Sequence, residues 1–373
     1  MSADTLASFH ESAVRILEGQ GNAARLRQPD AATQSFPDSQ WRQLAQAGWL
    51  RILVPQEHGG LGLGIQELGA IFRAVGTHLV RGPLLDHAVS IALLMAHVSE
   101  PARKRLDAAL DGEKLIACAR SLPPPHGEGA ELTLRGDRLW GVAELVGFGQ
   151  WADELIVFAQ DRGECVLVLA SAQTCSRQPC ASVDPCVQYC RIELRGLQVR
   201  PEDVLVRGPA ASQLLGQIED IQRLMMAAEI SAGVQALVDM SIEYAKLRRQ
   251  FGRAIGSFQA LAHMLAELAA KCSALGHLVT ACMADAVAEP ARLHALALVA
   301  KSYACTVGRY AAQEALQVHG GIGFTNELTL HLFYRRILTH QGFLGETDAL
   351  LCELGASQLA GDAPIGQSPE RAQ

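Results

Sequence analysis

The residue pattern of this chain changes twice, and these changes constrain the fold more than any other feature of the sequence. Up to Leu110, apolar residues recur at helical spacing. Between about Leu115 and Val206, glycines and prolines become more frequent, and short runs of β-forming residues appear. From Ser212 the helical spacing returns and continues almost to the end. The pattern predicts a mostly helical α+β protein with a β domain inserted between two helical parts.

The middle segment contains several candidate strands. Residues 154–159 and 165–170 have the length and composition of strands. Residues 130–141 are typical of two short strands that meet at a Gly-Asp turn at 136–137. The sequence Arg-Gly-Pro at 207–209 then indicates the return to helix.

Helices are expected on both sides of this segment. Residues 41–49 (W-R-Q-L-A-Q-A-G-W) carry apolar side chains on one helical face, and a glycine ends the run. The expected C-terminal helices cover residues 218–247, 258–285, 291–319, 330–337 and 344–359. The helix at 291–319 is apolar on much of its circumference, which predicts burial on most sides.

These segments predict three domains and a tail. The N-terminal helical domain is expected at 1–114, the middle β domain at 115–208 and the C-terminal helical bundle at 209–360. The polar residues 361–373 are expected to be disordered.

Composition excludes several classes of function. The formal net charge of the 373 residues is −7, so there is no basic footprint for nucleic acid. The first ten residues lack the basic region and apolar run of a signal peptide. No apolar stretch is expected to reach transmembrane length. We therefore expect a cytoplasmic protein with no membrane span.

The chain has ten cysteines, which raises the question of a metal site. Four of them cluster, at Cys175, Cys180, Cys186 and Cys190. Their spacing lacks the close C-x-x-C pairs of common zinc sites. We therefore expect reduced structural thiols and no metal.

The stretch 244–259 (Y-A-K-L-R-R-Q-F-G-R-A-I-G-S-F-Q) combines cations, an aromatic ring and helix-ending glycines. Arg248 and Phe251 are three residues apart, which predicts that they project from one helical face. Such a pair can hold a phosphate and cover a flat ring system. Gly252 is expected to end one helix, and Ser257 to cap the next. The alternative is a solvated helix end with a buried Phe.

Three ordered motifs resemble the acyl-CoA dehydrogenase family of flavoproteins. They are R-x-x-F-G-x-x-I-G-x-F-Q at 248–259, Q-V-H-G-G-I-G-F at 317–324 and V-P-Q-E-H-G-G-L-G at 54–62. The resemblance extends from about residue 39 to residue 359. It implies an N-terminal helical domain, a middle β domain and a C-terminal four-helix bundle.

The resemblance also implies an FAD site. Arg248 and Phe251 would contact the FAD of a neighbouring subunit, so the protein would be an oligomer. Four further residues would approach the adenosine half of the same cofactor: Gln259, Gln317, Gly320 and Gly321. The alternative for the two glycines is an ordinary helix stop. His319, between these motif residues, is expected to be structural.

Family members take a proton from the α carbon of an acyl-CoA with a carboxylate, and the β hydrogen leaves as hydride to flavin. The two family positions for this base fall here on Leu344 and Gln222. Neither side chain accepts a proton from carbon. Glu346 is a weaker candidate for the base, reached by a small shift in register, and Asp220 and Glu219 lie near the second position. The alternative is that these three are solvated helix-end carboxylates.

The middle domain departs from the family pattern. The loop that usually touches the flavin ring corresponds to 117–125 (A-C-A-R-S-L-P-P-P), and the next contact pair falls on Leu145 and Gly147. The usual side-chain partners of the flavin ring are therefore missing.

Two functions follow from the resemblance. The first is FAD-dependent α,β-dehydrogenation of an acyl-CoA, with an electron-transfer flavoprotein or similar acceptor. The second is a weakly active subunit that scaffolds a base-bearing partner in a mixed oligomer. The sequence H-G-G-I-G-F-T at 319–325 with H-L-F-Y-R-R at 331–336 resembles the branch that acts on bulky, steroid-like acyl-CoAs.

Overall fold

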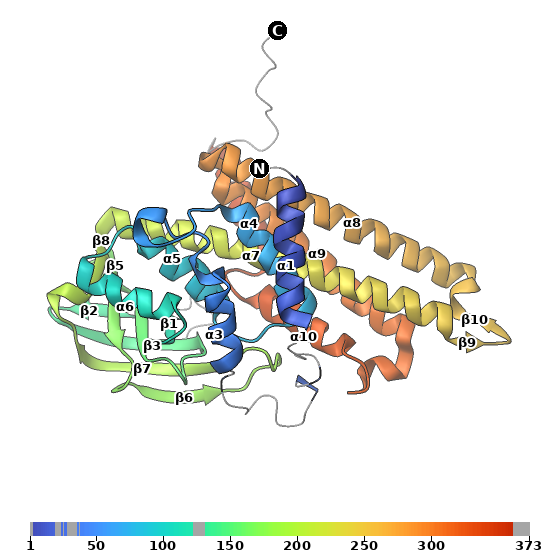
Figure 1. The fold of residues 1–373 in the computed structure, drawn as a ribbon, viewed down its shortest axis with the longest axis horizontal. Helices are drawn as coiled ribbons and strands as arrows, with labels where there is room; N and C mark the ends of the chain where they lie inside the picture. Colours follow the sequence, from blue (N-terminus) through green and yellow to red (C-terminus); the bar gives the residue numbers. More distant parts are fainter. Residues whose placement is uncertain are drawn as a thin grey trace, which may run out of the picture. The chain divides into compact units, whose positions relative to one another are not determined.

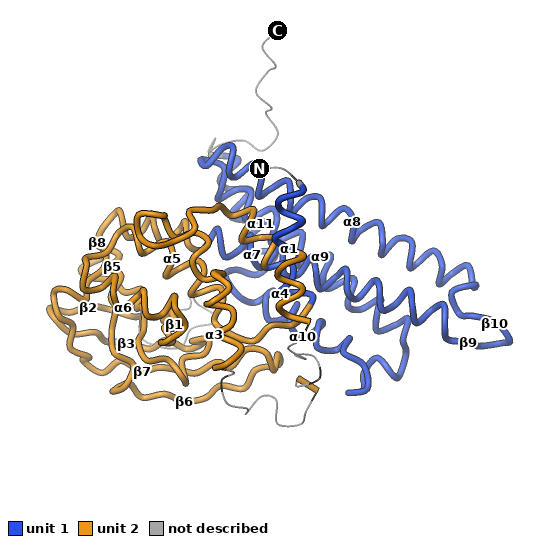
Figure 2. Tube along the Cα trace, viewed as in Figure 1, with its two compact units in different colours: residues 1–10, 72–77, 219–373 blue, residues 11–71, 78–218 orange. Residues whose placement is uncertain are grey.

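The computed structural model describes residues 3–18, 24, 26–27, 36, 38–121 and 131–360. Helices precede and follow a set of strands in the middle of the chain (Figure 1). The chain forms two compact units (Figure 2), of which unit 1 comprises Met1–His10, Phe72–Thr77 and Glu219–Gln373 and unit 2 comprises Glu11–Ile71 and His78–Ile218. Helix α1 (Ala3–Glu18) contributes to both units. The tail expected at 361–373 lies outside the described residues.

The helices of unit 2 pack around two tryptophans. Trp41 and Trp49 are buried, and glycines at 48, 82 and 112 have positive φ where the chain turns. A Cβ at Gly82 would lie 3.1 Å from the Trp41 ring, so only glycine lets the backbone approach it this closely. The elements are α3 (Asp38–Gln46), η1 (Trp49–Arg51), η2 (Gln56–His58), the start of α4 (Ile65–His78), the π-helical turn η3 (Asp86–Ile91), α5 (Ala92–Leu94) and α6 (Glu100–Leu110).

The strands of unit 2 form one eight-stranded sheet in the order β6-β7-β3-β2-β4-β5-β8, with β1 beside β4. The expected strands and the turn at 136–137 are confirmed, because β2 and β3 are antiparallel and flank that turn. The bounds are β1 (Ile116–Ala119), β2 (Thr133–Arg135), β3 (Arg138–Gly147), β4 (Glu154–Asp161), β5 (Glu164–Ser171), β6 (Ser176–Cys180), β7 (Tyr189–Gln198) and β8 (Val204–Arg207), with η4 (Pro201–Asp203) before β8.

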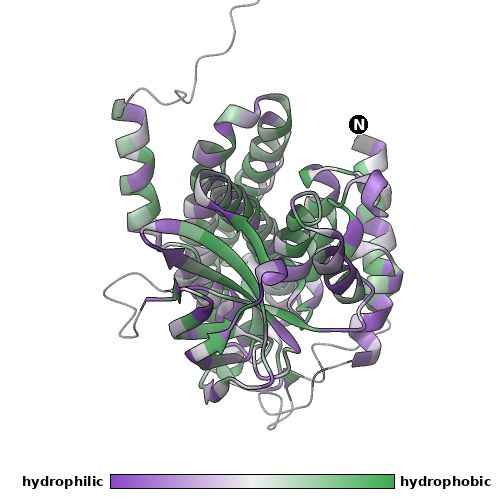
Figure 3. Cartoon of the chain, turned by 90° about the vertical axis from the view of Figure 1, so that its left-hand side faces the viewer, coloured by the Kyte–Doolittle hydropathy of each residue, from purple (hydrophilic) through white to green (hydrophobic). Residues whose placement is uncertain are grey.

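The core of the sheet lies along β4 and β5. Six consecutive residues are buried in each of these strands, so both faces of this part of the sheet are covered. The strands accordingly appear largely hydrophobic in Figure 3. This burial explains why 154–159 and 165–170 have near-continuous apolar sequences.

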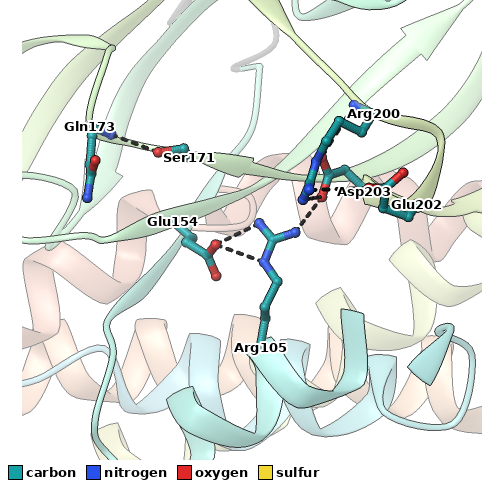
Figure 4. A network of polar contacts seen from close by, with 7 residues as sticks. All are labelled: Arg105, Glu154, Ser171, Gln173, Arg200, Glu202 and Asp203. Carbon is teal, nitrogen blue, oxygen red and sulfur yellow. Dashed lines mark hydrogen bonds and ion pairs between the residues drawn. The ribbon is translucent and has the colours of Figure 1, made fainter. Parts of the chain in front are cut away.

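A network of charged side chains joins α6 to the sheet (Figure 4). The guanidinium of Arg105 donates to Glu154 Oε1 at 2.8 and 2.6 Å and also pairs with Asp203. Arg200 Nε donates to the other oxygen of Asp203 at 2.9 Å. Because both carboxylates are largely buried, removing the Arg105 guanidinium would leave two buried charges without this partner.

Unit 1 is a helical bundle. Its elements are the main part of α7 (Gly208–Leu247), the short strands β9 (Arg249–Gln250) and β10 (Arg253–Ala254), η5 (Ile255–Ser257), α8 (Gln259–Ala288), η6 (Pro290–Arg292), α9 (Leu293–His319), η7 (Gly320–Phe324), α10 (Leu330–Gly342) and α11 (Thr347–Ala360). Helices α8, α10 and α11 all pack against α9. The expected fold of helices, a β domain and a helical bundle is confirmed.

Small residues let the helices of unit 1 approach closely. A Cβ at Gly308 on α9 would lie 2.8 Å from Ile230 Cγ2 on α7. A Cβ at Gly76 on α4 would lie 2.2 Å from the carbonyl oxygen of Glu229. Because real Cβ contacts are never this short, each glycine is required for the observed packing.

Helix α7 is the one helix in the described part of the chain that is long and apolar enough to cross a membrane. The expectation that no stretch has this length is therefore wrong. In its most apolar window, 72% of the residues are buried within the chain. This burial is typical of a core helix, whose apolar surface other helices cover.

All ten cysteines are free thiols. Most are buried, and burial raises the pKa of several of them, including Cys190, to about 11. The four clustered cysteines lie in unit 2, from the turn before β6 to β7. Among the described residues, no three His, Cys, Asp or Glu side chains come together as metal ligands.

His87 is enclosed in unit 2 and links η3 to α6 and β1. Its Nδ1 lies 3.2 Å from the carbonyl of Ala109, and its Nε2 lies 3.3 Å from the amide of Ile116. Nε2 also lies 3.1 Å from the carbonyl oxygen of Ile116, so each ring nitrogen faces a backbone carbonyl group. Burial lowers the pKa of His87 to about 4, so the ring is neutral at pH 7.

We predict that His87 makes the protein acid-labile. The unfolded chain binds this proton near pH 6.5, whereas the folded chain binds it only near pH 4. Stability from this group is therefore lost as the pH falls from 6.5 to 4, by about 3 kcal/mol. The free energy of unfolding of wild type should fall more steeply in this range than that of His87→Gln. The prediction would be contradicted if the free energies of unfolding of wild type and His87→Gln fell equally between pH 6.5 and pH 4.

Candidate functional site

The Arg-Phe motif lies on an exposed hairpin after α7. The helix ends at Leu247, and β9 pairs with β10 through a two-residue turn at Phe251 and Gly252. Both turn residues have positive φ, +52° and +80°, as in the tight turns that match strand twist. The prediction that Arg248 and Phe251 project from one helical face is therefore wrong. The helix has ended before Arg248, and the hairpin positions both residues.

The hairpin exposes apolar and cationic side chains together. Phe251 is 90% exposed and Leu247 is 79% exposed, which is unusual for large apolar residues. The rings of Phe251 and Phe258 meet edge to face at 6.2 Å, and the Arg253 guanidinium lies 3.9 Å from the Phe258 ring centroid. Arg248 and Arg249 are also exposed. Such a surface suits a ligand or a second chain that carries a flat ring and negative charge.

Ser257 does not cap α8. The residue at the cap position is Phe258, and it makes no side-chain capping bond. The Ser257 hydroxyl instead donates to the carbonyl of Ala254 at 2.7 Å, within the turn η5. The predicted cap is wrong because the turn itself offers a nearer acceptor. Gln259, the first residue of α8, is exposed beside this turn.

The second motif lies at the end of α9. The helix ends at His319, and Gly320 has φ +62°. His319 is buried, donates from Nδ1 to the carbonyl of Ala315 at 2.8 Å, and stacks on Tyr244 at 4.4 Å. Burial lowers the pKa of His319. These contacts hold the end of α9 against the end of α7.

The structure brings the two motifs to one end of the bundle. Val318, between the motif residues, is buried in a cluster with Ala245 and Ile255 beside the hairpin. Gln317, Gly320 and Gly321 are exposed at this end. A Cβ at either glycine would meet no atom within 4 Å, so a ligand has room to approach the backbone. A groove of about 590 Å³ lies between the end of α7 and the start of α8.

The two candidate base positions both lie in unit 1, and the residue after the first contacts the second. Gln222 is fully buried on α7, and Leu344 lies in the loop between α10 and α11 with φ +56°. Arg223, next to Gln222, donates from Nε to the carbonyl of Leu344 at 3.1 Å. Arg223 and Leu344 are 121 residues apart in the chain, and only the bundle makes them neighbours.

The carboxylates beside Gln222 are engaged by cations. Asp220 is buried, accepts from Arg223 Nη1 at 2.7 Å and lies 3.0 Å from His294 Nδ1. The other ring nitrogen of His294 lies 3.2 Å from Glu353 Oε1. Glu219 lies 3.9 Å from Arg223. Asp220 and Glu219 thus form ion pairs in the bundle, unlike the solvated carboxylates of the alternative interpretation.

Glu346 lies just before α11, whose first residue is Thr347. Its side chain is exposed, and its carbonyl accepts from the amide of Leu350 in the first turn of the helix. The helix expected from residue 344 begins three residues later. Leu344 and Glu346 are therefore loop residues, and their orientation depends on contacts made by the loop backbone.

Lys301 is a feature of this region that the sequence analysis missed. It lies in the middle of α9 with 0% exposure, and its ammonium donates to the carbonyls of Phe343 and Gly345. Burial lowers the pKa of Lys301 to about 8, and the nearby Glu346 carboxylate opposes the shift. The signal was present, because a lysine inside an apolar helical run is almost never buried without partners.

The flavin-ring region of the middle domain is described in part. Ala117 to Ala119 lie buried in β1, whereas 122–125 fall outside the described residues. Leu145 is 46% exposed and Gly147 is half-buried, both on β3. Neither has a side-chain group that hydrogen-bonds a ring, so the backbone is the available partner at these positions.

Comparison with known proteins gives the family. Residues 4–110 match the acyl-CoA dehydrogenase N-terminal domain, and 217–359 match the acyl-CoA dehydrogenase C-terminal domain. The acyl-CoA dehydrogenase IpdE2 of Mycobacterium tuberculosis is 30% identical over 88% of this chain and 89% of its own length. The chain belongs to the acyl-CoA dehydrogenase family. It is thus an acyl-CoA dehydrogenase-type oxidoreductase.

Solved structures of the acyl-CoA dehydrogenase fold superpose on almost the whole chain. The ChsE4-ChsE5 complex from Mycobacterium tuberculosis contains a chain with a TM-score of 0.85 and 22% identity, covering 98% of this chain and 99% of its own length. The Tcur3481-Tcur3483 steroid ACAD G363A variant gives a TM-score of 0.83 and 26% identity, with 97% and 99% coverage.

We predict that Arg223→Met destabilises the protein by roughly 3 kcal/mol, because Asp220 loses its guanidinium partner while it remains buried. Chemical denaturation should show the loss. Arg309→Met, which changes an exposed arginine on α9, is the matched control and should unfold like wild type. Adding Asp220→Asn to Arg223→Met should restore part of the stability. Equal midpoints for Arg223→Met and wild type would refute the buried pair.

Proposed function

We propose that this chain is an FAD-binding subunit of an enzyme that dehydrogenates a bulky acyl-CoA between its α and β carbons. Family membership supports the reaction class. A structural relative described as a steroid ACAD supports a bulky acyl group of the steroid side-chain type. The side chains at positions 222 and 344, neither of which is a base, carry the proposal that the chain depends on a partner.

The exposed end of the bundle fits one part of FAD. Arg248 would pair with the diphosphate, and the exposed ring of Phe251 would cover a flat part of the cofactor. Gln317 and Gln259 would add hydrogen bonds, and the open backbone at Gly320 and Gly321 would admit the ligand closely. Because this surface faces outward, we propose that it completes the FAD site of a neighbouring subunit. A monomer would leave it exposed, so the enzyme is an oligomer.

The reaction needs a base at the α carbon and an acceptor for the β hydrogen. Bound FAD would supply the electron sink that takes this hydrogen with its electron pair. The chain would bind the thioester, exclude water and place position 344 or 222 beside the α proton. A carboxylate with a raised pKa serves there in an apolar site. The amide of Gln222 and the methyl groups of Leu344 accept no proton.

The absence of a proton acceptor at positions 222 and 344 favours a mixed oligomer as the active enzyme. We propose that an unlike subunit of the same family supplies the carboxylate, and that this chain contributes the cofactor surface. The resemblance of the fold to a chain of the ChsE4-ChsE5 complex supports an assembly of this kind. Electron-transfer flavoprotein or a similar acceptor would reoxidise the cofactor. We place the enzyme in the cytoplasm.

We predict that Arg248→Ala weakens FAD binding at least about tenfold, because a charge-assisted contact to the diphosphate is lost. The variant should unfold like wild type, since Arg248 is exposed. Arg309→Ala, which removes an exposed arginine on α9, is the control. Fluorescence titration of the assembled oligomer with FAD measures the affinity. An unchanged affinity would show that the assignment is wrong, and protein that cannot be loaded with FAD would favour the scaffold role.

We predict that the isolated chain, loaded with FAD, bleaches slowly when mixed anaerobically with acyl-CoAs. Losing a general base costs about 10²–10⁴-fold in rate. Co-expression with a base-bearing homologue should restore rapid bleaching. The Leu344→Glu variant should gain activity without a partner. The Leu344→Gln variant should not, because the glutamine side chain has the shape of glutamate but lacks its charge. Rapid bleaching by wild type that Glu346→Gln abolishes would instead identify Glu346 as the base.

A further inference from the structure

The loop between α10 and α11 is held by cations at three successive carbonyl groups. Lys301 Nζ donates to the carbonyls of Phe343 and Gly345, the latter at 2.6 Å. Arg223 Nε donates to the carbonyl between them, that of Leu344, at 3.1 Å. Lys301 comes from α9 and Arg223 from α7. Two helices of the bundle therefore bind three successive carbonyl groups of this loop.

The backbone of this loop requires such support. Leu344 has φ +56°, a conformation that costs a non-glycine residue energy and persists only when its surroundings impose it. Gly345 follows with φ +106°. A Cβ there would lie 2.6 Å from Leu350 Cδ2, so the loop also packs tightly on α11. The two cations supply the constraint that keeps Leu344 in this conformation.

A buried lysine is costly unless it has strong partners. Lys301 is fully buried, and its ammonium donates to two carbonyl groups of this loop. Burial lowers its pKa to about 8, consistent with an ammonium that has exchanged water for backbone carbonyls. The chain thus keeps a buried charge on α9, and this charge contacts the segment that contains candidate base position 344.

We propose that Lys301, assisted by Arg223, is a positioning residue that makes residue 344, and not residue 346, the one that this loop presents to the substrate. The inference rests on the proposed function, which places position 344 at the α carbon. Moving Glu346 into that place would shift the loop by two residues and break all three carbonyl contacts. Glu346 lies beyond the last of these carbonyls, at the exposed start of α11.

The first test measures the loop directly and needs neither cofactor nor substrate. Hydrogen–deuterium exchange on the full chain should become roughly tenfold faster across residues 343–350 in Lys301→Met, because the backbone has lost its anchors. Lys271→Met, the same change at a partly exposed lysine on α8, is the control. Lys301→Gln keeps side-chain donors and should restore part of the protection. It also serves as the test variant if Lys301→Met does not fold. Exchange equal to that of the control overturns the inference.

The second test measures the chemistry in the Leu344→Glu background. Adding Lys301→Met should lower the first-order bleaching rate about ten- to hundredfold, as expected for a displaced catalytic group. The dissociation constant for acyl-CoA and the FAD content should stay within twofold of those of Leu344→Glu. A double variant that bleaches as fast as Leu344→Glu overturns the positioning role.

The two tests distinguish the inference from the proposed function. If Leu344→Glu gains no activity although it binds FAD and acyl-CoA, the placement of position 344 at the α carbon fails. The exchange measurement then decides the carbonyl anchoring without reference to activity. If the exchange rate rises and the double variant loses its rate, both parts are supported.

Discussion

The burial of α9 is the constraint on which unit 1 depends. Three other helices pack against it, and 17 of its residues are buried, so each buried polar group on it needs a partner within the protein. Gly308 leaves room for α7 to pack closely against α9. His319 finds its partners by donating to its own helix and stacking on Tyr244. Lys301 finds its partners by bonding to the loop after α10. The buried polar groups of α9 thus organise residues at both candidate sites.

Buried charges in unit 1 follow the same rule. Burial alone would raise the pKa of Glu229, but His340 and Arg336 outweigh this and lower it to about 2. His340 Nε2 lies 3.1 Å from Glu229 Oε2, and Arg336 pairs with the other oxygen. Asp220 is held in a similar way by Arg223 and His294. Ion pairs of this kind are costly to break from one side, so they restrict how the helices can shift.

Much of the fold was predictable because hydrophobic spacing is a local property. The strands at 154–159 and 165–170 and the buried helix at 291–319 follow from periodicity and glycine positions alone. The regular elements begin at Ile116 and Gly208, close to the two changes in pattern. The division into three domains at 114 and 208 stays a prediction. The hairpin at 249–254 was missed, because a turn that places Phe251 at positive φ has no strong residue signature.

For the candidate site, too, some features follow from the sequence and others only from the tertiary structure. By itself, the sequence determined the order of the elements, the motif residues and the types of side chain at positions 222 and 344, which already excluded an ordinary base there. Tertiary structure alone decided that Arg223 contacts the loop of Leu344, that Arg248 leaves the helix, and that Lys301 anchors the same loop. The physical reason is that contacts between residues 121 positions apart arise only from helix packing. Periodicity reports which face of a helix is buried, but not which distant backbone that face meets.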